Sequence, residues 1–270
     1  MRPLILITND DGVFSPGLRA VAEAVIELGD LLIAAPRYQQ TGMSRALHGG
    51  DDAGIIEETT IPVKGKPHRA YGIHATPALA VAHAVFELCS RRPDLCISGI
   101  NYGENIGMTI SASGTVGAAL EAAMIGIPAL AISRGAPLDH HRAHEYEELD
   151  WTTAGTVSRL MAEKVLQYGL SPLVDVLNVN VPDSATMHTE IRPTVQSHQR
   201  HVYFTRPERR DFARHFVLPL TDTVDPQTLE PDSDIQAFLI DNVISVSPLT
   251  ARLAAATESR DLLRYVSGQV

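Results

Sequence analysis

The first half of the chain alternates short, unbroken apolar runs with segments of helical spacing. The apolar runs lie at residues 4–7, 31–35, 95–97 and 129–132. Continuous aliphatic runs of this length are typical of strands that a parallel sheet buries on both faces. The helices between them are predicted to begin at Ser15, Thr76 and Ser113, where a capping residue precedes the helical positions. This alternation predicts βαβ units and an α/β fold with a mostly parallel sheet.

The second half is less regular. Its predicted elements are a helix capped by Asp150, strands at 174–181 and 243–246, and a terminal helix at 254–265. The stretch 192–234 has scattered charges and several prolines, which predicts either a hairpin extension or a long functional loop. Because the chain shows no internal repeat and no clear linker, we expect one domain. Its core is expected at about 1–190 and its extension at about 191–270.

Composition limits the classes of function. The 270 residues include 22 Lys and Arg against 32 Asp and Glu, a net charge of −10, which argues against a nucleic-acid track. Two cysteines, Cys89 and Cys96, form no disulfide framework and indicate a reducing compartment. The first apolar run is shorter than the roughly 7–15 residues of a secretory signal, and no stretch approaches the ~20 apolar residues of a membrane span. We therefore expect a soluble, cytoplasmic protein without a membrane partner.

Polar residues follow several of the predicted strands directly. They occur at residues 9–12, 37–44 and 98–107, and the helix start at 113–115 comes after the last of these loops. Ligands bind at the carboxyl ends of the strands in open α/β sheets. We therefore expect these residues to converge on one crevice.

Asp10 and Asp11 are adjacent carboxylates at the end of the first strand. They repel each other unless a cation joins them, and after Asp11 the next Lys or Arg is Arg19. Oxygen ligands of this kind suit Mg²⁺, Mn²⁺ or Ca²⁺. The alternative is that residues 9–12 form only a turn, since Asn, Asp and Gly favour turns for local reasons.

The second candidate is the helix start at Ser113, Gly114 and Thr115. The free N–H groups and partial positive charge of a helix N-terminus suit a phosphate. The alternative is an ordinary N-cap, which Ser and Thr also favour. The chain contains neither a P-loop GxxxxGK[ST] nor a GxGxxG after the first strand, so a dinucleotide site is disfavoured.

Two further clusters have both a functional and a plain explanation. A histidine group can bind a soft metal or lie in an exposed loop, and an arginine group can clamp an anion or form a solvated face. The histidines are His140, His141 and His144, and the arginines are Arg206, Arg209 and Arg210.

Several blocks of this sequence resemble those of the survival protein SurE family, which comprises divalent-metal-dependent 5'/3'-nucleotidases. The blocks in the first 135 residues are TNDDG at 8–12, AP at 35–36 with TG at 41–42, SGINYG at 98–103 with Asn105 and Gly107, and SGTV at 113–116 with Ala118, Ala119 and Glu121. Weaker matches continue at 177–182, 232–234 and 246–249. The resemblance implies a Rossmann-like three-layer core. It also implies a C-terminal extension exchanged between the subunits of a homodimer or homotetramer.

Position by position, the resemblance also implies the site. The metal ligands fall on Asp10, Asp11, Thr41 and Asn101, and one divalent cation per subunit is expected, Mg²⁺ or Mn²⁺ with Ca²⁺ as a further candidate. The catalytic group comprises Asn9, Asp10 and Asp11, and the substrate phosphate is expected at Asn101, Ser113, Gly114 and Thr115.

The sequence departs from the family pattern in the loop at 37–46, after the second predicted strand, which we call the second loop. Thr41 stands where the family usually has Ser, and it keeps the hydroxyl oxygen. Arg37 and Tyr38 replace a common Asp-Arg pair, and residues 44–46 (SRA) replace a common Gly-His-Ser. Arg45 and Ala46 would therefore border the substrate side.

The predicted reaction is the hydrolysis of nucleoside 5'-monophosphates, and also 3'-monophosphates or other small phosphate esters, to nucleoside and phosphate. Water attack assisted by an aspartate and a covalent aspartyl-phosphate both remain open. The alternative function is a non-catalytic nucleotide or phosphate sensor that uses the same crevice. A metal-dependent sugar-nucleotide transferase is a third possibility, since a carboxylate pair can hold its metal as well.

Overall fold

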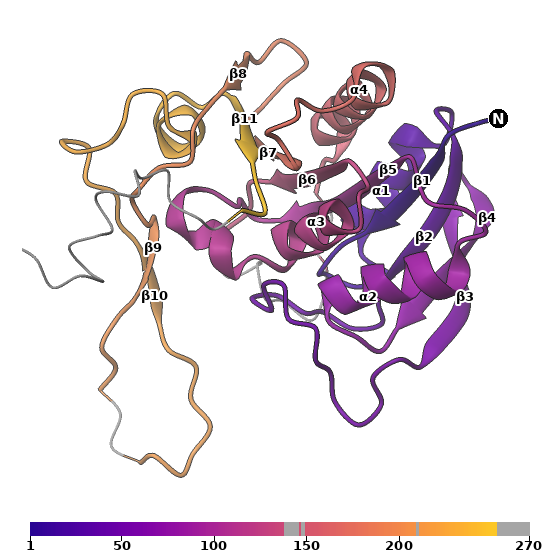
Figure 1. Ribbon diagram of the computed structural model, residues 1–270. Coiled ribbons are helices and arrows are strands. Elements are labelled where there is room, and N and C mark those ends of the chain that lie inside the picture. Colours follow the sequence, from indigo (N-terminus) through magenta and orange to yellow (C-terminus); the bar gives the residue numbers. More distant parts are fainter. Residues whose placement is uncertain (138–145, 147–148, 209–210, 253–270) are drawn as a thin grey trace, which may run out of the picture.

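A nine-stranded sheet in the order β3-β4-β2-β1-β5-β6-β7-β11-β8 runs through the middle of the molecule (Figure 1). The computed structural model describes residues 1–137, 146, 149–208 and 211–252. The strands are β1 Leu4–Thr8, β2 Asp30–Pro36, β3 Ile56–Val63, β4 Lys66–Ile73, β5 Leu95–Tyr102, β6 Ala129–Arg134, β7 Val176–Val181, β8 Ile191–Pro193, β9 Val202–Phe204, β10 Leu220–Asp222 and β11 Ile244–Leu249. The helices are α1 Pro16–Val25, α2 Pro77–His83, α3 Gly114–Met124 and α4 Thr152–Tyr168, with short 3₁₀ or π turns at Ala84–Leu88, Gly107–Ala112 and Gln236–Ile240.

Helices cover both faces of this sheet. Ile5 and Ile7 of β1 pack in one core with residues of α1 and α4, whereas Leu6 packs in a second core with residues of α2 and α3. The strands from β4 through β7 run parallel, and β3 and β11 pair antiparallel to their neighbours β4 and β7. The predicted three-layer α/β fold with a mostly parallel sheet is confirmed.

The four strands and three helix starts predicted in the first half are all present. Ser15, Thr76 and Ser113 each cap a helix, and each side-chain oxygen accepts a backbone N–H three residues ahead. Strand β5 is longer than predicted because Gly99 carries it past a bulge at a φ of 139°. A Cβ at Gly99 would lie 2.3 Å from the carbonyl oxygen of Ile132, so this position requires glycine.

The β3–β4 hairpin was not predicted. Lys64 and Gly65 connect the two strands with φ values of 49° and 72°, the left-handed geometry of a tight hairpin turn. The Lys-Gly step was the available signal. It went unrecognised because two adjacent glutamates and two adjacent threonines interrupt β3, which therefore forms no continuous apolar run.

The second half contains the predicted helix and strands. Helix α4 begins two residues after Asp150, whose carboxylate accepts the N–H of Thr152 at 2.9 Å. Within 192–234 the chain forms the antiparallel hairpin β9–β10, which projects from the body (Figure 1). We call residues 200–222 the arm. After the arm the chain returns to the sheet as β11, between β7 and β8.

Some predictions fall outside the described residues. These are the terminal helix at 254–265, the histidine group His140, His141 and His144, and two of the three arginines, Arg209 and Arg210. Arg206 is described and is exposed on the arm. Among the helices in the described part of the chain, none has the length and apolarity required to cross a membrane.

Candidate functional site

A cavity of about 180 Å³ lies at the carboxyl end of β1 and β5, between the core and the root of the arm. From the predicted site it contains Asp10, Thr41, Asn101 and Ser113. Further lining residues come from the loop after β5 and from the arm, namely Glu104, Asn105, Thr109, Arg200, His201, Val202, Phe204 and Leu220. The predicted convergence of the strand-end loops is therefore seen in the structure, and the arm adds a wall that was not expected.

Asp10 is held against the start of α3. Its Oδ1 accepts a hydrogen bond of 2.6 Å from the Thr115 hydroxyl, and its side chain is 2% exposed. A Cβ on Gly114 would lie 2.7 Å from Oδ2 of Asp10, so the close approach depends on glycine. Burial raises the pKa of Asp10 to about 6 from 3.8, although hydrogen bonds from Thr115 and the backbone of Gly114 oppose this rise.

Asp11 lies deeper, and one of its carboxylate oxygens lacks a partner. The N–H of Tyr102 donates to Oδ2 at 3.3 Å, whereas the buried Oδ1 accepts no hydrogen bond. Burial first, and then the charge of Asp10, raises the pKa of Asp11 well above its usual value. Within the described residues neither aspartate forms an ion pair with a Lys, Arg or His. A buried carboxylate oxygen without a donor is costly unless a cation completes it.

Asn101 and Thr41 supply neutral oxygens to the same cavity. The amide nitrogen of Asn101 donates to the carbonyls of Tyr102 and Gly103, at 3.2 and 2.7 Å, which fixes the amide and leaves its oxygen for a ligand. No group of three His, Cys, Asp or Glu side chains able to hold a metal occurs in the described part of the chain. A cation here would depend on the aspartate pair, Asp10 and Asp11, together with these two neutral oxygens. Such an oxygen-only set suits a hard divalent cation.

Asn9 holds the loop that carries the aspartates. Its amide donates to the carbonyl of Gly12 at 3.2 Å and to the Ser15 hydroxyl at 2.6 Å, and its oxygen accepts the N–H of Gly12 at 3.1 Å. All of its polar atoms are thus engaged inside the loop. These contacts make Asn9 a positioning residue, and its catalytic role stays a prediction.

The helix start predicted to bind phosphate is largely engaged with the protein itself. The hydroxyl of Ser113 caps the N–H of Val116 at 3.1 Å, and the Thr115 hydroxyl serves Asp10. Of these residues Ser113 reaches the cavity wall, and Gly114 and Thr115 are buried behind it. The assignment of all three to phosphate therefore stays a prediction.

The loop at 103–112, which we call the glycine-rich loop, is fixed by a buried polar network. The carbonyl of Asn105 accepts hydrogen bonds from Asn178 and Asn180 at 2.8 and 3.1 Å. Asp234 accepts the N–H of Gly107 at 2.9 Å and the N–H of Ser197 at 3.0 Å. The distant asparagines and Asp234, whose roles the sequence left unassigned, thus position the loop that follows β5.

The sequence did not single out the residues that the arm contributes. His201 Nε2 lies 2.9 Å from Glu104 Oε1, and both side chains are at least nine-tenths buried. Arg200 lines the cavity and lies over the Tyr203 ring at 5.6 Å. Reasoning from strand ends could not find them, because their place depends on how the arm folds back.

Two departures from the family pattern have carboxylate partners. Arg37 Nε lies 2.6 Å from Glu57 Oε2, and Arg45 lies 3.0 Å from Glu121 Oε2. The backbone carbonyl of Ala46 accepts the hydroxyl of Thr76. These contacts stabilise the second loop, and none of the three residues lines the cavity beside Asp10.

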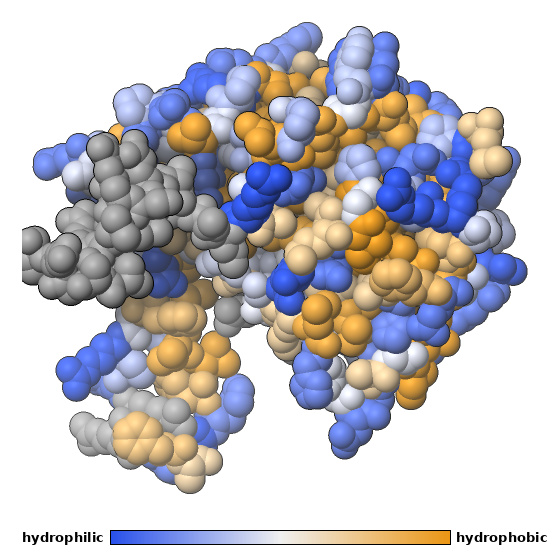
Figure 2. Space-filling model, viewed as in Figure 1, coloured by the Kyte–Doolittle hydropathy of each residue, from blue (hydrophilic) through white to orange (hydrophobic). Residues whose placement is uncertain are grey.

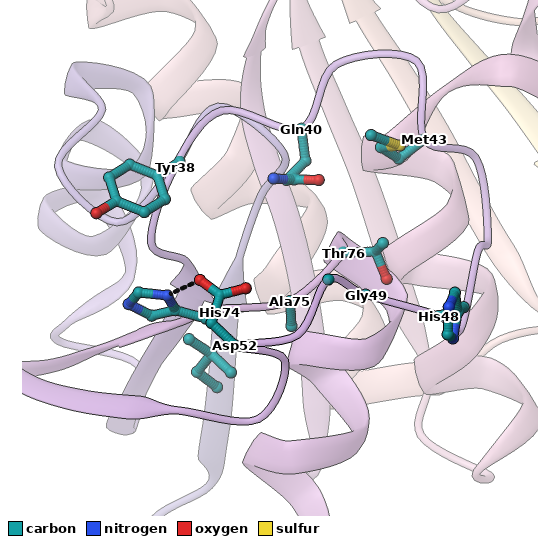
Figure 3. A pocket seen from close by; sticks show the side chains of 11 residues that line it. Tyr38, Gln40, Met43, His48, Gly49, Asp52, His74, Ala75 and Thr76 are labelled. Atoms are coloured by element: carbon teal, nitrogen blue, oxygen red, sulfur yellow. Dashed lines mark hydrogen bonds and ion pairs between the residues drawn. The ribbon is translucent and has the colours of Figure 1, made fainter.

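A second cavity, of about 370 Å³, lies between the second loop and the end of β4 (Figure 3). His74 stands on its wall, 2.6 Å from Asp52 and 2.8 Å from Glu57, and the Tyr38 ring meets it edge-on at 5.6 Å. Hydrogen bonds from His74 lower the pKa of both carboxyl groups, and those contacts raise the pKa of His74. None of the predicted metal ligands lines this cavity.

The chain is similar to known proteins over most of its length. The family model described as survival protein SurE matches residues 5–204. The 5'-nucleotidase SurE of Methanosarcina barkeri is 36% identical over 98% of both chains. The 5'-nucleotidase SurE of Thermococcus gammatolerans is 35% identical over 98% of this chain and 96% of its own.

A solved structure shows the same architecture. The crystal structure of the SurE protein from Aquifex aeolicus superposes with a TM-score of 0.75 at 27% identity, covering 98% of this chain and 100% of that one. Sequence and structure therefore agree over almost the whole length. The chain belongs to the survival protein SurE family.

Proposed function

We propose that this protein is a divalent-metal-dependent phosphomonoesterase that hydrolyses nucleoside 5'-monophosphates, and also 3'-monophosphates, to nucleoside and phosphate. The observation that carries the proposal is the aspartate pair, which is buried, has no cationic partner among the described residues, and lies beside a cavity that Thr41 and Asn101 line. Relatives with full-length similarity are named 5'-nucleotidases, which favours a hydrolase over a non-catalytic sensor.

Each residue of the candidate site has a proposed role. Asp10, Asp11, Thr41 and Asn101 would hold one cation, Mg²⁺ or Mn²⁺ with Ca²⁺ as a further candidate. When bound, that cation supplies Lewis-acid charge for a phosphate ester. Thr115 orients the Asp10 carboxylate through its hydroxyl, and Asn9 keeps the loop of both aspartates in one shape. Ser113 lies on the cavity wall at the start of α3, where the partial positive charge of the helix N-terminus favours an anionic oxygen.

The test is phosphate release from AMP, 3'-AMP and other phosphate esters, before and after treatment with EDTA. We expect release that stops in the chelator and returns with Mg²⁺ or Mn²⁺. Saturable nucleotide binding without phosphate release would favour the sensor, and undiminished release in EDTA would exclude the metal.

The arm supports a homodimer or homotetramer. Its exposed apolar side chains include Phe212, Phe216, Val217 and Leu218, and apolar residues cover much of the projecting hairpin in Figure 2. Exposed apolar groups on a projecting element favour contact with another chain. Light scattering of the wild type and of Val217→Asp tests this assembly. A monomeric wild type would exclude it. The cytoplasmic location expected from the sequence stays a prediction.

A further inference from the structure

The cavity beside Asp10 has two chemically different walls. The core wall includes four residues with oxygen-bearing side chains, Asp10, Thr41, Asn101 and Ser113. The arm wall includes three apolar side chains, Val202, Phe204 and Leu220, together with Arg200 and His201. A nucleotide is divided in a similar way, into an anionic phosphate and a base whose aromatic face can stack on an apolar surface.

The arm wall is an ordered face of a two-stranded sheet. Val202 and Phe204 are two residues apart on β9, so their side chains point to the same side. Leu220 of β10 is the register partner of Phe204, which places it beside that ring on the same face. We call Val202, Phe204 and Leu220 the arm facet.

The root of the arm is anchored to the glycine-rich loop. His201 pairs with Glu104 at 2.9 Å, and the N–H of Met108 donates to the carbonyl of Gln199 at 2.8 Å. Gln196 also donates to the carbonyl of Gly107 at 3.0 Å. These contacts hold the arm facet at a fixed place relative to Asn105 of that loop and to Asn101 at the end of β5.

We propose that the arm facet is the nucleoside subsite of the candidate active site, with the Phe204 ring as the surface on which the base stacks. The ring is 56% exposed, so it has apolar area left for a ligand to cover. The inference rests on the proposed function, because it assigns the leaving group of that reaction. Arg200 on the same wall adds a positive group for an anionic ester, and it has no carboxylate partner in the described part of the chain.

The second cavity is the competing place for a base. It offers the Tyr38 ring and the Met43 side chain, but none of the predicted metal ligands lines it. The arm facet shares one cavity with Asp10 and Asn101. The geometry therefore favours the arm facet.

The experiment compares two substrates in matched variants. AMP carries a base, whereas glycerol 2-phosphate has a phosphate and no ring. We expect Phe204→Ala to lower kcat/KM for AMP about tenfold, mainly through KM, since stacking of a base on an aromatic ring is worth that much or more. In the same variant, kcat/KM for glycerol 2-phosphate should stay within about twofold of the wild-type value. Phe204→Tyr, which keeps an aromatic ring, should hydrolyse AMP as the wild type does.

Two controls locate the effect. Phe86→Ala removes an exposed ring that lies outside the arm and does not line the cavity, and it should change the hydrolysis of neither substrate. Tyr38→Ala tests the second cavity. The proposal would be overturned if Phe204→Ala lost activity equally on both substrates or lost none. It would also be overturned if Tyr38→Ala, instead of Phe204→Ala, lost the preference for AMP. A change in oligomer mass in Phe204→Ala with unchanged kinetics would overturn it too.

A binding measurement separates this inference from the proposed function. Calorimetric titration of adenosine needs no turnover. Wild type should bind adenosine, and Phe204→Ala should bind it about tenfold more weakly. If wild type hydrolyses no phosphate ester, the proposed function fails, and this titration still decides the subsite. Equal adenosine affinity in both proteins, or no binding to wild type, contradicts the subsite.

Discussion

Two groups of acidic side chains lie near the carboxyl ends of the sheet, and they differ in every property that matters for a cation. The aspartate pair at the end of β1 is buried, and within the described residues it has no cationic partner. Asp52 and Glu57 beside the end of β4 are more exposed and share His74, with Arg37 on Glu57 as well. We call these last four residues the charged network.

The pKa values run in opposite directions in the two groups. Burial raises the pKa of both Asp10 and Asp11, whereas hydrogen bonds from His74 and Arg37 lower the pKa of Asp52 and Glu57. Side chains of the protein therefore satisfy the charges of the network. Within the described part of the chain no Lys, Arg or His pairs with the aspartate pair, which supports the metal site that we propose there.

The largest expected effect is on catalysis by Asp11→Asn. The amide removes a negative charge and an oxygen donor from the proposed metal ligands, so phosphate release from AMP should fall at least about a hundredfold. Circular dichroism should show a retained fold. Asp52→Asn is the matched change in the charged network. Its rate of phosphate release from AMP should stay within about threefold of the wild-type rate. Similar losses in both variants would remove the distinction between the two groups.

A backbone change beside Asp10 should have the next largest effect. Gly114→Ala places a methyl group 2.7 Å from Asp10 Oδ2, so the carboxylate or the start of α3 must move. A displacement of about 1 Å in a catalytic group can cost on the order of a hundredfold, and we expect a loss of ten- to a hundredfold. Gly155→Ala is the control, because a Cβ there meets only ordinary contacts at 3.7 Å or more. Full activity in Gly114→Ala would contradict the described packing of Asp10.

Stability should depend on pH through the aspartate pair when metal is absent. The folded pKa of Asp10 is about 6, above its ordinary 3.8, so the folded state holds the proton more tightly than the unfolded chain. The folded state is therefore favoured at low pH, and this advantage is lost as the pH rises from about 4 through about 6. In EDTA, Tm should fall across this range more steeply for wild type than for Asp11→Asn. Parallel curves would show that the pair does not titrate as described.

The smallest effects belong to the charged network. His74→Ala should change AMP hydrolysis by less than about twofold, because His74 touches no predicted ligand. The pKa of His74 is raised, so its ion pairs stabilise the folded state at low pH. This contribution disappears as the pH rises through the raised pKa. Solvent screens the carboxylates of Asp52 and Glu57, so we expect this contribution to stability to be small. Urea denaturation at two pH values measures the difference, and a hundredfold loss of activity in this variant would place His74 in the site.

Much of the fold was predictable because the core strands are continuous apolar runs. Residues 4–7 and 129–132 could hardly lie anywhere except in a buried sheet, and Ser113 is a cap in sequence and in structure alike. The β3–β4 hairpin was missed because its faces are only partly buried and charged residues interrupt its pattern. A periodicity argument detects burial more readily than it detects strands.

The candidate site was predictable in its oxygen ligands and not in its surroundings. Asp10, Thr41 and Asn101 follow strands that end at the same edge, so topology alone predicts that they meet. Glu104, His201 and Phe204 join them through the fold of the arm, which local sequence does not determine. The sequence also did not predict the hydrogen bond from Thr115 to Asp10, because a threonine at this helix start can bind a phosphate or donate to that carboxylate.

Calorimetric titration of Mn²⁺ into the metal-free protein tests the central claim most directly, because it requires neither substrate nor turnover. Wild type and Asp52→Asn should each bind one equivalent per chain with similar affinity, and Asp11→Asn should show no binding in the same range. Undiminished binding by Asp11→Asn, or its loss in Asp52→Asn, would contradict the assignment of the metal to the aspartate pair.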